Sequence, residues 1–281
     1  MRTEIWFFRL LKLSAIAVIT LLMIVIAFLV KESWPVLHEV GVSKFFLDAE
    51  WHPTEQSFGM LSMLSASLAT SVGAMLIAGP LGVGCAVFCC MFAPQSVAQI
   101  YKRILAVLAG IPSVVFGFWG LTVIVPLIAT WQAPGASLLA GIIILFLMIL
   151  PTVTLTSEAA LAAVPKSYIT GAEALGLSRG ATILNVMLPA ARDGIIAGGV
   201  LALARALGET MAVVMVTGNI TQVPSSLFDP VRTLTANIAL EMAYAVGNHH
   251  SALFVSGLIL IVVVCVLVLV SERFSRAAHH A

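Results

Sequence analysis

Residues 137–156 have the sequence SLLAGIIILFLMILPTVTLT, and none of these 20 positions is charged. A helix needs about 20 mostly apolar residues to cross the hydrocarbon core of a bilayer. The stretch is therefore predicted to be a transmembrane helix. Its uncharged character is typical of the whole chain, which has 281 residues and is 60% hydrophobic and only 10% charged. A soluble globular protein has about 25% charged residues, so the bilayer is the expected solvent.

Five further stretches satisfy the same length and polarity requirement, and no soluble domain is left between them. They are residues 10–30, 60–92, 104–130, 194–217 and 251–270. The sequence thus predicts an all-α, polytopic membrane protein in which residues 1–281 form one transmembrane domain with six spans. The second and third stretches are long, and Pro80, Gly110 and Pro112 suit local irregularity in them.

The distribution of basic residues predicts the orientation. Ten Lys and Arg fall in segments on the side of both termini, namely Arg2, Arg9, Lys12, Lys102, Arg103, Lys166, Arg179, Arg192, Arg273 and Arg276. Only Lys31, Lys44 and Arg232 fall on the opposite side. Because cytoplasmic loops carry an excess of basic residues, both termini and residues 157–193 are expected in the cytoplasm.

Several classes of function are disfavoured by residue types and spacing. The net charge of +1 without a basic run argues against nucleic acid, whose phosphates need clustered Lys and Arg. The four cysteines lie in apolar runs and the six histidines lack metal-ligand spacing, so no metal site or cofactor is expected. No phosphate-cradling G-x-x-x-x-G-K-[ST] run and no pair of nucleophile and base stand out. The chain is therefore not expected to be an enzyme, and ATP hydrolysis would belong to a partner.

The segment between the fourth and fifth spans has a pattern of its own. Residues 157–189, SEAALAAVPKSYITGAEALGLSRGATILNVMLP, favour two short amphipathic helices that meet at Gly176. A short helix held across the mouth of a bundle is suited to docking a partner, although a purely structural loop remains an alternative.

This segment resembles the EAA loop of the permease subunits of ATP-binding-cassette importers. Gly176 is followed after nine residues by Val186-Met187-Leu188-Pro189, as in that signature, whereas Thr170 stands where the signature has Glu. The resemblance implies the fold of type I importer permeases and a coupling loop that docks on a cytoplasmic ATPase dimer. The residues assigned to this contact are Thr170, Gly171, Ala172, Glu173, Ala174, Leu175 and Gly176.

Four other stretches narrow the resemblance to PstC-type permeases of phosphate importers. They are EWHPTEQSFG from Glu50, ATSVGAMLIAGPLGVGCAVF from Ala69, LAGIPSVVFGFWGL from Leu108 and ARALGETMAVVMVTGN from Ala204. This likeness implies inorganic phosphate as substrate, a PstA-like second permease, an extracytoplasmic phosphate-binding protein and the bacterial inner membrane. A sulfate or molybdate importer, or a self-contained secondary anion carrier, remains an alternative.

Arg205 and Glu209 are anomalous because they lie inside the apolar stretch 194–217. An Arg at the centre of a span costs about 2.5–3.5 kcal/mol on insertion scales, so it should face protein or water. On a continuous helix, Gly194, Gly198, Arg205 and Glu209 would share one face. We expect Arg205 to bind the anion and Glu209 to hold its guanidinium in place. The alternative is a structural ion pair beside a close helix contact.

Hydroxyl groups early in the second span are weaker candidates for the anion path. Ser67, Thr70 and Ser71 cluster there and could donate hydrogen bonds to an oxyanion. Ser and Thr in membrane helices often bond to their own backbone instead. Gly110, Pro112 and Ser113 could mark a broken helix, although a tolerated kink is the commoner outcome.

Overall fold

The computed structural model describes the backbone of residues 2–278 and the side chains of residues 6–273. Its helices are α1 (Arg2–Val40), α2 (Val42–Leu47), α3 (Leu61–Met91), α4 (Gln95–Gly110), α5 (Ser113–Trp119), α6 (Val125–Ala129), α7 (Leu138–Ala162), α8 (Lys166–Ala174), α9 (Arg179–Thr182), α10 (Leu188–Leu207), α11 (Met211–Val216), α12 (Leu234–Glu241) and α13 (Asn248–Ala278). Shorter elements are the strands β1 (Trp51–His52) and β2 (Ser57–Phe58), the 3-10 turn η1 (Pro53–Glu55) and the π-helical turns η2 (Gly120–Ile124) and η3 (Ile183–Met187).

The described residues contain five helical segments that are long and apolar enough to cross a membrane. These are Trp6–Val40, Leu61–Met91, Leu138–Ala162, Arg179–Leu207 and Asn248–Arg273. A sixth span exists only if α4 and the following helix through α6, which are bent by 90°, are counted together. The helical, multi-pass architecture expected from the composition is thus confirmed, with a two-stranded hairpin as an addition.

The third predicted stretch, residues 104–130, is not one kinked helix, and this corrects the expectation that a tolerated kink would suffice. Helix α4 ends at Gly110, Ile111 is extended (φ −66°, ψ 129°), and a new helix begins at Ser113 behind Pro112. Proline disfavours helical geometry in the residue before it and has no N–H to donate. The helix therefore breaks at Ile111, and the chain turns through 90°.

The core of the bundle is formed by α3, α7 and α10. Glycines let the first two helices approach closely, because Gly73 lies against Ile142 and Gly82 lies against Val153. The buried side chains of Ala74, Ala78, Leu145, Ile149, Val153, Ala202, Ala206 and Val213 fill the space between the three helices. Helix α7 is fixed at its start by Ser137, whose hydroxyl accepts a hydrogen bond from the N–H of Ala140.

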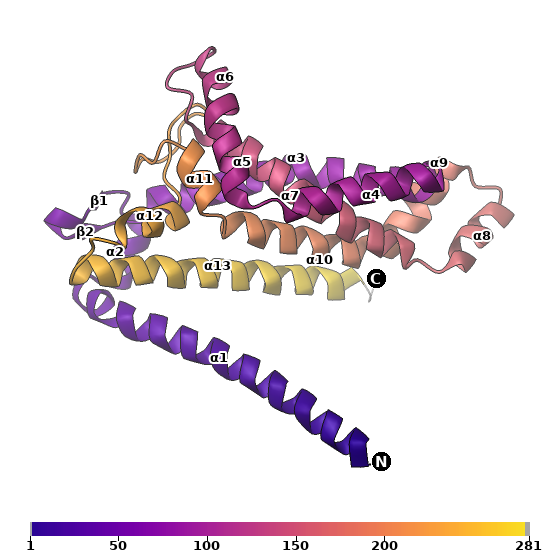
Figure 1. Cartoon of the computed structure of the whole chain (residues 1–281), viewed down its shortest axis with the longest axis horizontal. Helices are drawn as coiled ribbons and strands as arrows, with labels where there is room; N and C mark the ends of the chain where they lie inside the picture. The colour runs from indigo at the N-terminus through magenta and orange to yellow at the C-terminus, as the bar shows by residue number, and fades with distance from the viewer. Residues whose placement is uncertain (1, 279–281) are drawn as a thin grey trace.

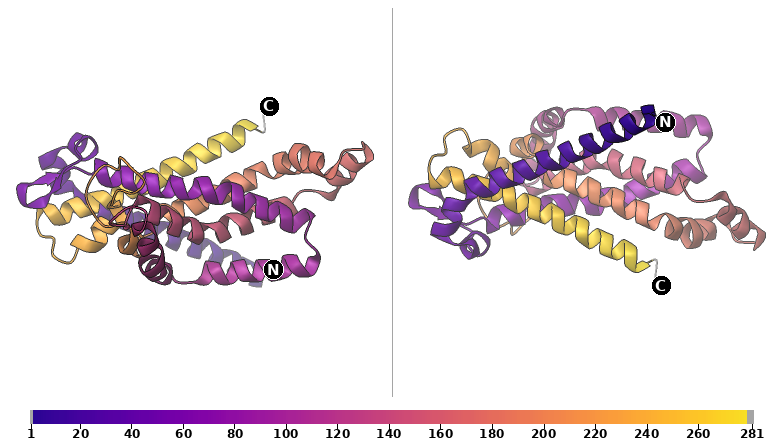
Figure 2. Two further views of the ribbon diagram at one scale, coloured as in Figure 1. Left: turned by 90° about the horizontal axis from the view of Figure 1, so that it is seen from above. Right: turned by 90° about the horizontal axis from the view of Figure 1, so that it is seen from below.

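Two groups of short elements lie at opposite ends of the bundle, whereas α5 and α6 turn away from its long axis (Figure 1). At one end, which we call the hairpin end, lie α2, the β1–β2 hairpin and α12, and Trp51 pairs with Phe58 in antiparallel register. At the other, the α8 end, α8 and α9 project beyond the long helices (Figures 1 and 2). The first turns of α1 and the last turns of α13 both point toward the α8 end, so they lie on the same side of the bundle.

Helix α1 packs only near its second half. Phe28 contacts Phe254 of α13, with ring centroids 5.6 Å apart, and from there α1 diverges from the bundle (Figure 1). None of the most apolar part of this helix is buried within the chain. Such a surface is stable only against lipid or another apolar chain.

Candidate functional site

Helices α7 and α10 pack along a seam of small residues that leads to Arg205. A Cβ atom added to Gly194 would lie 2.6 Å from the Cβ of Ala160, and one added to Gly198 would lie 2.6 Å from the Cβ of Thr156. The two helices therefore run antiparallel in van der Waals contact. The close helix contact that the sequence offered as part of the structural alternative is therefore present.

At the end of this seam, Arg205 Nη1 donates a hydrogen bond to Thr152 Oγ1 over 3.4 Å. Thr152 lies 14 residues after Leu138 and 10 before Ala162, about 21 and 15 Å along α7 at the helical rise. Arg205 is thus near the middle of the bundle, yet its side chain is exposed in the isolated chain. It also occupies the last turn of α10, where the helix dipole favours a cation.

Glu209 does not share a helical face with Arg205, contrary to the sequence-based expectation. Helix α10 ends at Leu207, and Glu209 lies in the break before α11. Its Oε1 accepts a hydrogen bond from the N–H of Ala212 over 3.2 Å, and its carbonyl accepts one from Thr235 Oγ1 over 2.7 Å. Within the described residues, Arg205 and Glu209 form no ion pair. Glu209 therefore stabilises the start of α11, and it does not hold the guanidinium.

The chemistry of this site depends on the hydrogen-bond donors of the Arg205 guanidinium. A guanidinium has five N–H donors, and the bond to Thr152 is the one side-chain hydrogen bond of Arg205 within the described part of the chain. The remaining donors form a planar fork that matches two oxygens of a tetrahedral oxyanion. In a low-dielectric setting such a charge-assisted bond is strong.

The predicted hydroxyl residues of α3 do not lie at the Arg205 site. Ser67, Thr70 and Ser71 are all buried, and the first two donate to carbonyls of their own helix. Ser67 Oγ also accepts a hydrogen bond from the N–H of Leu234 over 2.9 Å. Thr70 packs close to Gly141, which is 11 residues before Thr152 on α7, or about 16 Å along the helix. The structure therefore does not bring these hydroxyls to Arg205.

The segment between α7 and α10 forms the turn expected at Gly176. Gly176 adopts φ 74°, its N–H donates to the carbonyl of Glu173, and the N–H of Leu177 donates to that of Ala172. This pair of bonds is a Schellman motif, which favours glycine at the left-handed position. Ala172 is buried, whereas Thr170, Gly171, Glu173, Ala174, Leu175 and Gly176 are exposed. Leu175 is 83% exposed, so an apolar side chain projects from the α8 end.

The bounds of this segment are shorter than the predicted 157–193. Helix α7 continues to Ala162 and α10 begins at Leu188. Glu158, on the last turns of α7, accepts a hydrogen bond from Lys102 Nζ over 2.6 Å, which ties α4 to α7. A cavity of about 460 Å³ lies beside this ion pair.

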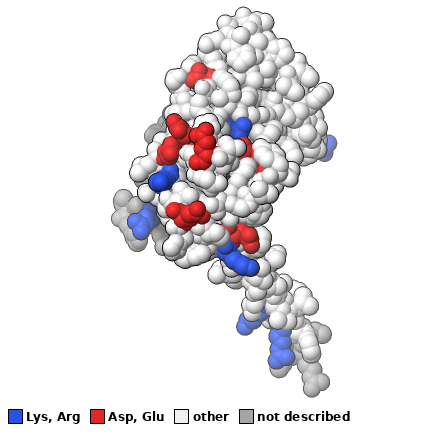
Figure 3. Space-filling view, turned by 90° about the vertical axis from the view of Figure 1, so that its left-hand side faces the viewer, with Lys and Arg blue, Asp and Glu red and all other residues white. Residues whose placement is uncertain are grey.

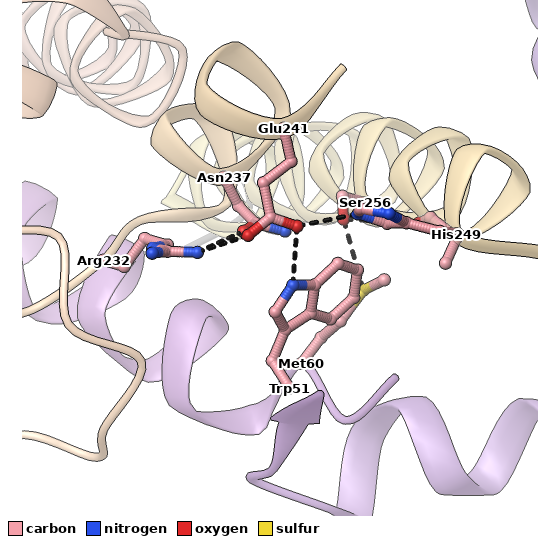
Figure 4. Close-up of polar contacts among 8 residues, drawn as sticks. Trp51, Met60, Arg232, Asn237, Glu241, His249 and Ser256 are labelled. Atoms are coloured by element: carbon pink, nitrogen blue, oxygen red, sulfur yellow. Dashed lines mark hydrogen bonds and ion pairs between the residues drawn. The ribbon is translucent and has the colours of Figure 1, made fainter. Parts of the chain in front are cut away.

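A buried polar cluster at the hairpin end was missed by the sequence-based analysis (Figure 4). The carboxylate of Glu241 accepts hydrogen bonds from Arg232 Nη1 over 2.6 Å, Trp51 Nε1 over 2.8 Å and His249 Nε2 over 2.8 Å. Arg232 also donates to the carbonyl of Asn219 and to Asn237 Oδ1. These groups come from the hairpin, the loop before α12, α12 and α13. Spacing along the chain gives no signal for such a cluster, because Trp51 and Glu241 are 190 residues apart.

The apolar helices, the broken spans and the projecting α8 segment together define a multi-pass membrane permease. The family described as "Binding-protein-dependent transport system inner membrane component" matches residues 78–278. The chain belongs to this family.

Relatives and solved structures agree with this assignment. The chain is 41% identical over 243 residues to the probable ABC transporter permease protein YqgH of Bacillus subtilis, covering 84% of this chain and 79% of the relative. It is 35% identical over 283 residues to the phosphate transport system permease protein PstC of Mesorhizobium japonicum, covering 93% and 86%. A structure of the MetNI methionine ABC transporter in inward-facing conformations matches with a TM-score of 0.62 and 18% identity, covering 76% of this chain and 93% of that chain. At this identity the structural likeness concerns the fold.

Proposed function

We propose that the chain is a transmembrane permease subunit of an ATP-driven phosphate importer. The proposal is carried by Arg205, an exposed guanidinium near the middle of an apolar bundle, whose one side-chain hydrogen bond to the described residues leaves most of its donors for a ligand. Relatives that cover most of the chain are named as phosphate transport permeases, and one of them is 35% identical over 283 residues. Ionisable residues at this depth in membrane proteins are rare and generally mark substrate or ion pathways, which supports the proposal.

In this proposal the hairpin end faces the outside of a bacterial inner membrane, and the α8 end and both termini face the cytoplasm. The excess of Lys and Arg on the α8 side supports this orientation. Residues 170–176 would dock on a cytoplasmic ATPase dimer, with the exposed Leu175 as an apolar anchor. A PstA-like second permease and an extracytoplasmic phosphate-binding protein complete the complex.

Transport would follow from two properties of this arrangement. Closure of the ATPase dimer pushes on the α8 segment, which is joined through η3 to α10, the helix that carries Arg205. The Arg205 fork binds the anion as it passes, and the site must be weak enough to release it. No step of ATP hydrolysis is assigned to this chain.

The test is phosphate uptake by the complex of both permeases, the ATPase and the phosphate-binding protein in proteoliposomes. We expect ATP-dependent accumulation of radioactive phosphate that an excess of sulfate or molybdate does not reduce. Uptake of sulfate or molybdate in place of phosphate would assign the chain to another oxyanion importer and overturn the proposal.

A variant tests the role of Arg205 separately. Arg205→Gln keeps a hydrogen-bonding side chain of similar length and removes the charge, so we expect phosphate uptake to fall at least tenfold while the complex still assembles. Loss of one charge-assisted hydrogen bond of about 1.5–3 kcal/mol predicts a change of this size. Normal uptake by a well-assembled Arg205→Gln complex would remove Arg205 from the anion path.

A further inference from the structure

The hairpin end carries a cleft whose lining does not include Arg205, Thr152 or Glu209. It is a cavity of about 490 Å³ with two walls. One wall is the turn of the hairpin, with Pro53, Thr54 and Gln56, and the other runs from α12 to α13, with Glu241, Tyr244, Val246 and His249. We call it the hairpin cleft.

The cleft is held open by the buried polar cluster beneath it. Trp51, in strand β1 of the hairpin, and His249, on the opposite wall, both donate to the same carboxylate oxygen of Glu241 (Figure 4). Asn248 Nδ2 bridges the walls a second time, because it donates to Gln56 Oε1 over 3.2 Å and to Glu39 Oε2 over 2.8 Å. A site whose walls are already fixed loses little conformational entropy when a partner binds.

Two side chains at the rim of the cleft, Tyr244 and Val246, are largely exposed to solvent. Tyr244 is 65% exposed and Val246 is 79% exposed. Tyrosine is enriched among the residues that contribute most to protein interfaces. These two side chains offer an aromatic and an aliphatic contact to a partner that binds at the cleft.

The charge of this end is strongly negative. Residues 31–60 and 218–250 contain seven Asp and Glu against three Lys and Arg, a net charge of −4 in a chain whose total is +1. Acidic side chains gather on the face seen in Figure 3. Glu39, Glu50 and Glu55 of these segments are exposed, and in the sequence Glu55 lies between Thr54 and Gln56 of the cleft wall.

This charge bears on how an anion reaches the permease. The net negative charge of these segments repels free phosphate and lowers its local concentration at this end. It attracts a basic protein surface and speeds its association. An anion therefore reaches this end most readily inside a carrier protein whose contacting surface is basic.

Building on the proposed function and orientation, we propose that the hairpin cleft is the docking site for a Lys- or Arg-bearing loop of the extracytoplasmic phosphate-binding protein. Tyr244 and Val246 pack against the loop, and the acidic rim, including Glu55, pairs with its cations. The Glu241 cluster is the rigid floor on which both walls rest.

The test measures ATPase activity of the reconstituted complex as the concentration of phosphate-loaded binding protein is raised. Glu55→Lys reverses one rim charge, and we expect the half-saturating concentration to rise about three- to tenfold with an unchanged maximal rate. Tyr244→Ala should raise it about tenfold. Raising the salt concentration should weaken docking to the wild-type complex more than to the Glu55→Lys complex.

Glu32→Lys is the matched control, because it makes the same charge change on α1, away from the cleft walls. We expect its half-saturating concentration to stay within about twofold of the wild-type value. Equal shifts for Glu32→Lys and Glu55→Lys, or no shift for Glu55→Lys and Tyr244→Ala, would overturn the assignment of the cleft.

A second measurement does not depend on whether the Glu55→Lys and Tyr244→Ala variants fold and assemble. A photo-crosslinking amino acid at position 244 of the assembled complex should capture the purified binding protein upon irradiation. Crosslinks only to the second permease, to a second copy of this chain or to lipid would contradict the proposal. Phosphate uptake by the wild-type complex is measured in parallel, so failure of docking at the cleft is distinguished from failure of the proposed function.

Discussion

The seam between α7 and α10 gives a prediction whose size follows from the structure. A Cβ atom added to Gly194 would lie 2.6 Å from the Cβ of Ala160 and 3.5 Å from its Cα. Carbon atoms of packed side chains are normally about 3.5–4.0 Å apart, so Gly194→Ala must push the helices apart by about 1 Å. Overpacking of this kind costs about 1–3 kcal/mol.

The assay is thermal unfolding of the purified complex in detergent. For a domain of this size about 1 kcal/mol changes the Tm by about 2–4 °C, so Gly194→Ala should lower the Tm by about 2–12 °C. Gly84→Ala is the control, because Gly84 lies inside α3 and has nothing within 4 Å of the added Cβ. Alanine is the better helix former, so this variant should be neutral or slightly stabilising.

Exchanging glycine and alanine between positions 160 and 194 makes the test specific for the contact between α7 and α10. Ala160→Gly removes the Cβ atom that Gly194→Ala would meet, at a cost of about 1 kcal/mol in helix propensity. In the double variant the two changes should compensate, with a coupling energy of at least about 1 kcal/mol. Additive effects, or a Gly194→Ala variant as stable as Gly84→Ala, would show that the helices do not meet at these residues.

Three other predictions address the polar groups around Arg205 and the hairpin end. Thr152→Val removes the acceptor of Arg205 and should raise the apparent KM for phosphate uptake about tenfold, because a hydrogen bond to a charged group contributes about 1.5–3 kcal/mol and this bond is long, at 3.4 Å; an unchanged KM would contradict this. Glu209→Gln keeps an oxygen for the start of α11 and should preserve uptake, whereas Glu209→Ala should lower the free energy of unfolding by about 0.5–2 kcal/mol, and equal unfolding curves would refute the capping role. Glu241→Gln leaves Arg232 without its counter-ion, so the free energy of unfolding should fall by about 3–5 kcal/mol. An unchanged Tm in the same thermal assay would show that the cluster is not formed.

The long apolar helices could be predicted from the sequence because they depend on composition over about 20 residues. Helix α3 coincides closely with a predicted span, whereas α7 and α13 overlap theirs and continue beyond the predicted ends. The turn at Gly176 was also predictable, since its positive φ favours glycine. Both features are local.

The breaks in the third and fifth stretches were harder to predict. Proline and glycine are tolerated in membrane helices when neighbouring chains satisfy the backbone, so Pro112 alone does not decide between a kink and a break. The break after Leu207 was not predicted, because a helical period was assumed to continue to Thr217. Glu209 was therefore placed on a face that does not exist in the structure.

The cluster around Glu241 could not be predicted because it depends on tertiary structure. Its donors lie in polar segments, where a charged residue is ordinarily solvated. Only the packing of the hairpin against α12 and α13 brings Trp51 and His249 to the same carboxylate. The positions of Ser67 and Thr70, which bond to their own helix, likewise depend on which face α3 turns to its neighbours.

The most direct test of the proposed function is the energy source of phosphate uptake by the reconstituted complex. Phosphate should accumulate in the proteoliposomes only when ATP is supplied to the ATPase, and a protonophore or an ionophore should leave the uptake unchanged. Uptake driven by an ion gradient in the absence of ATP would contradict it, because the chain would then act as a secondary carrier.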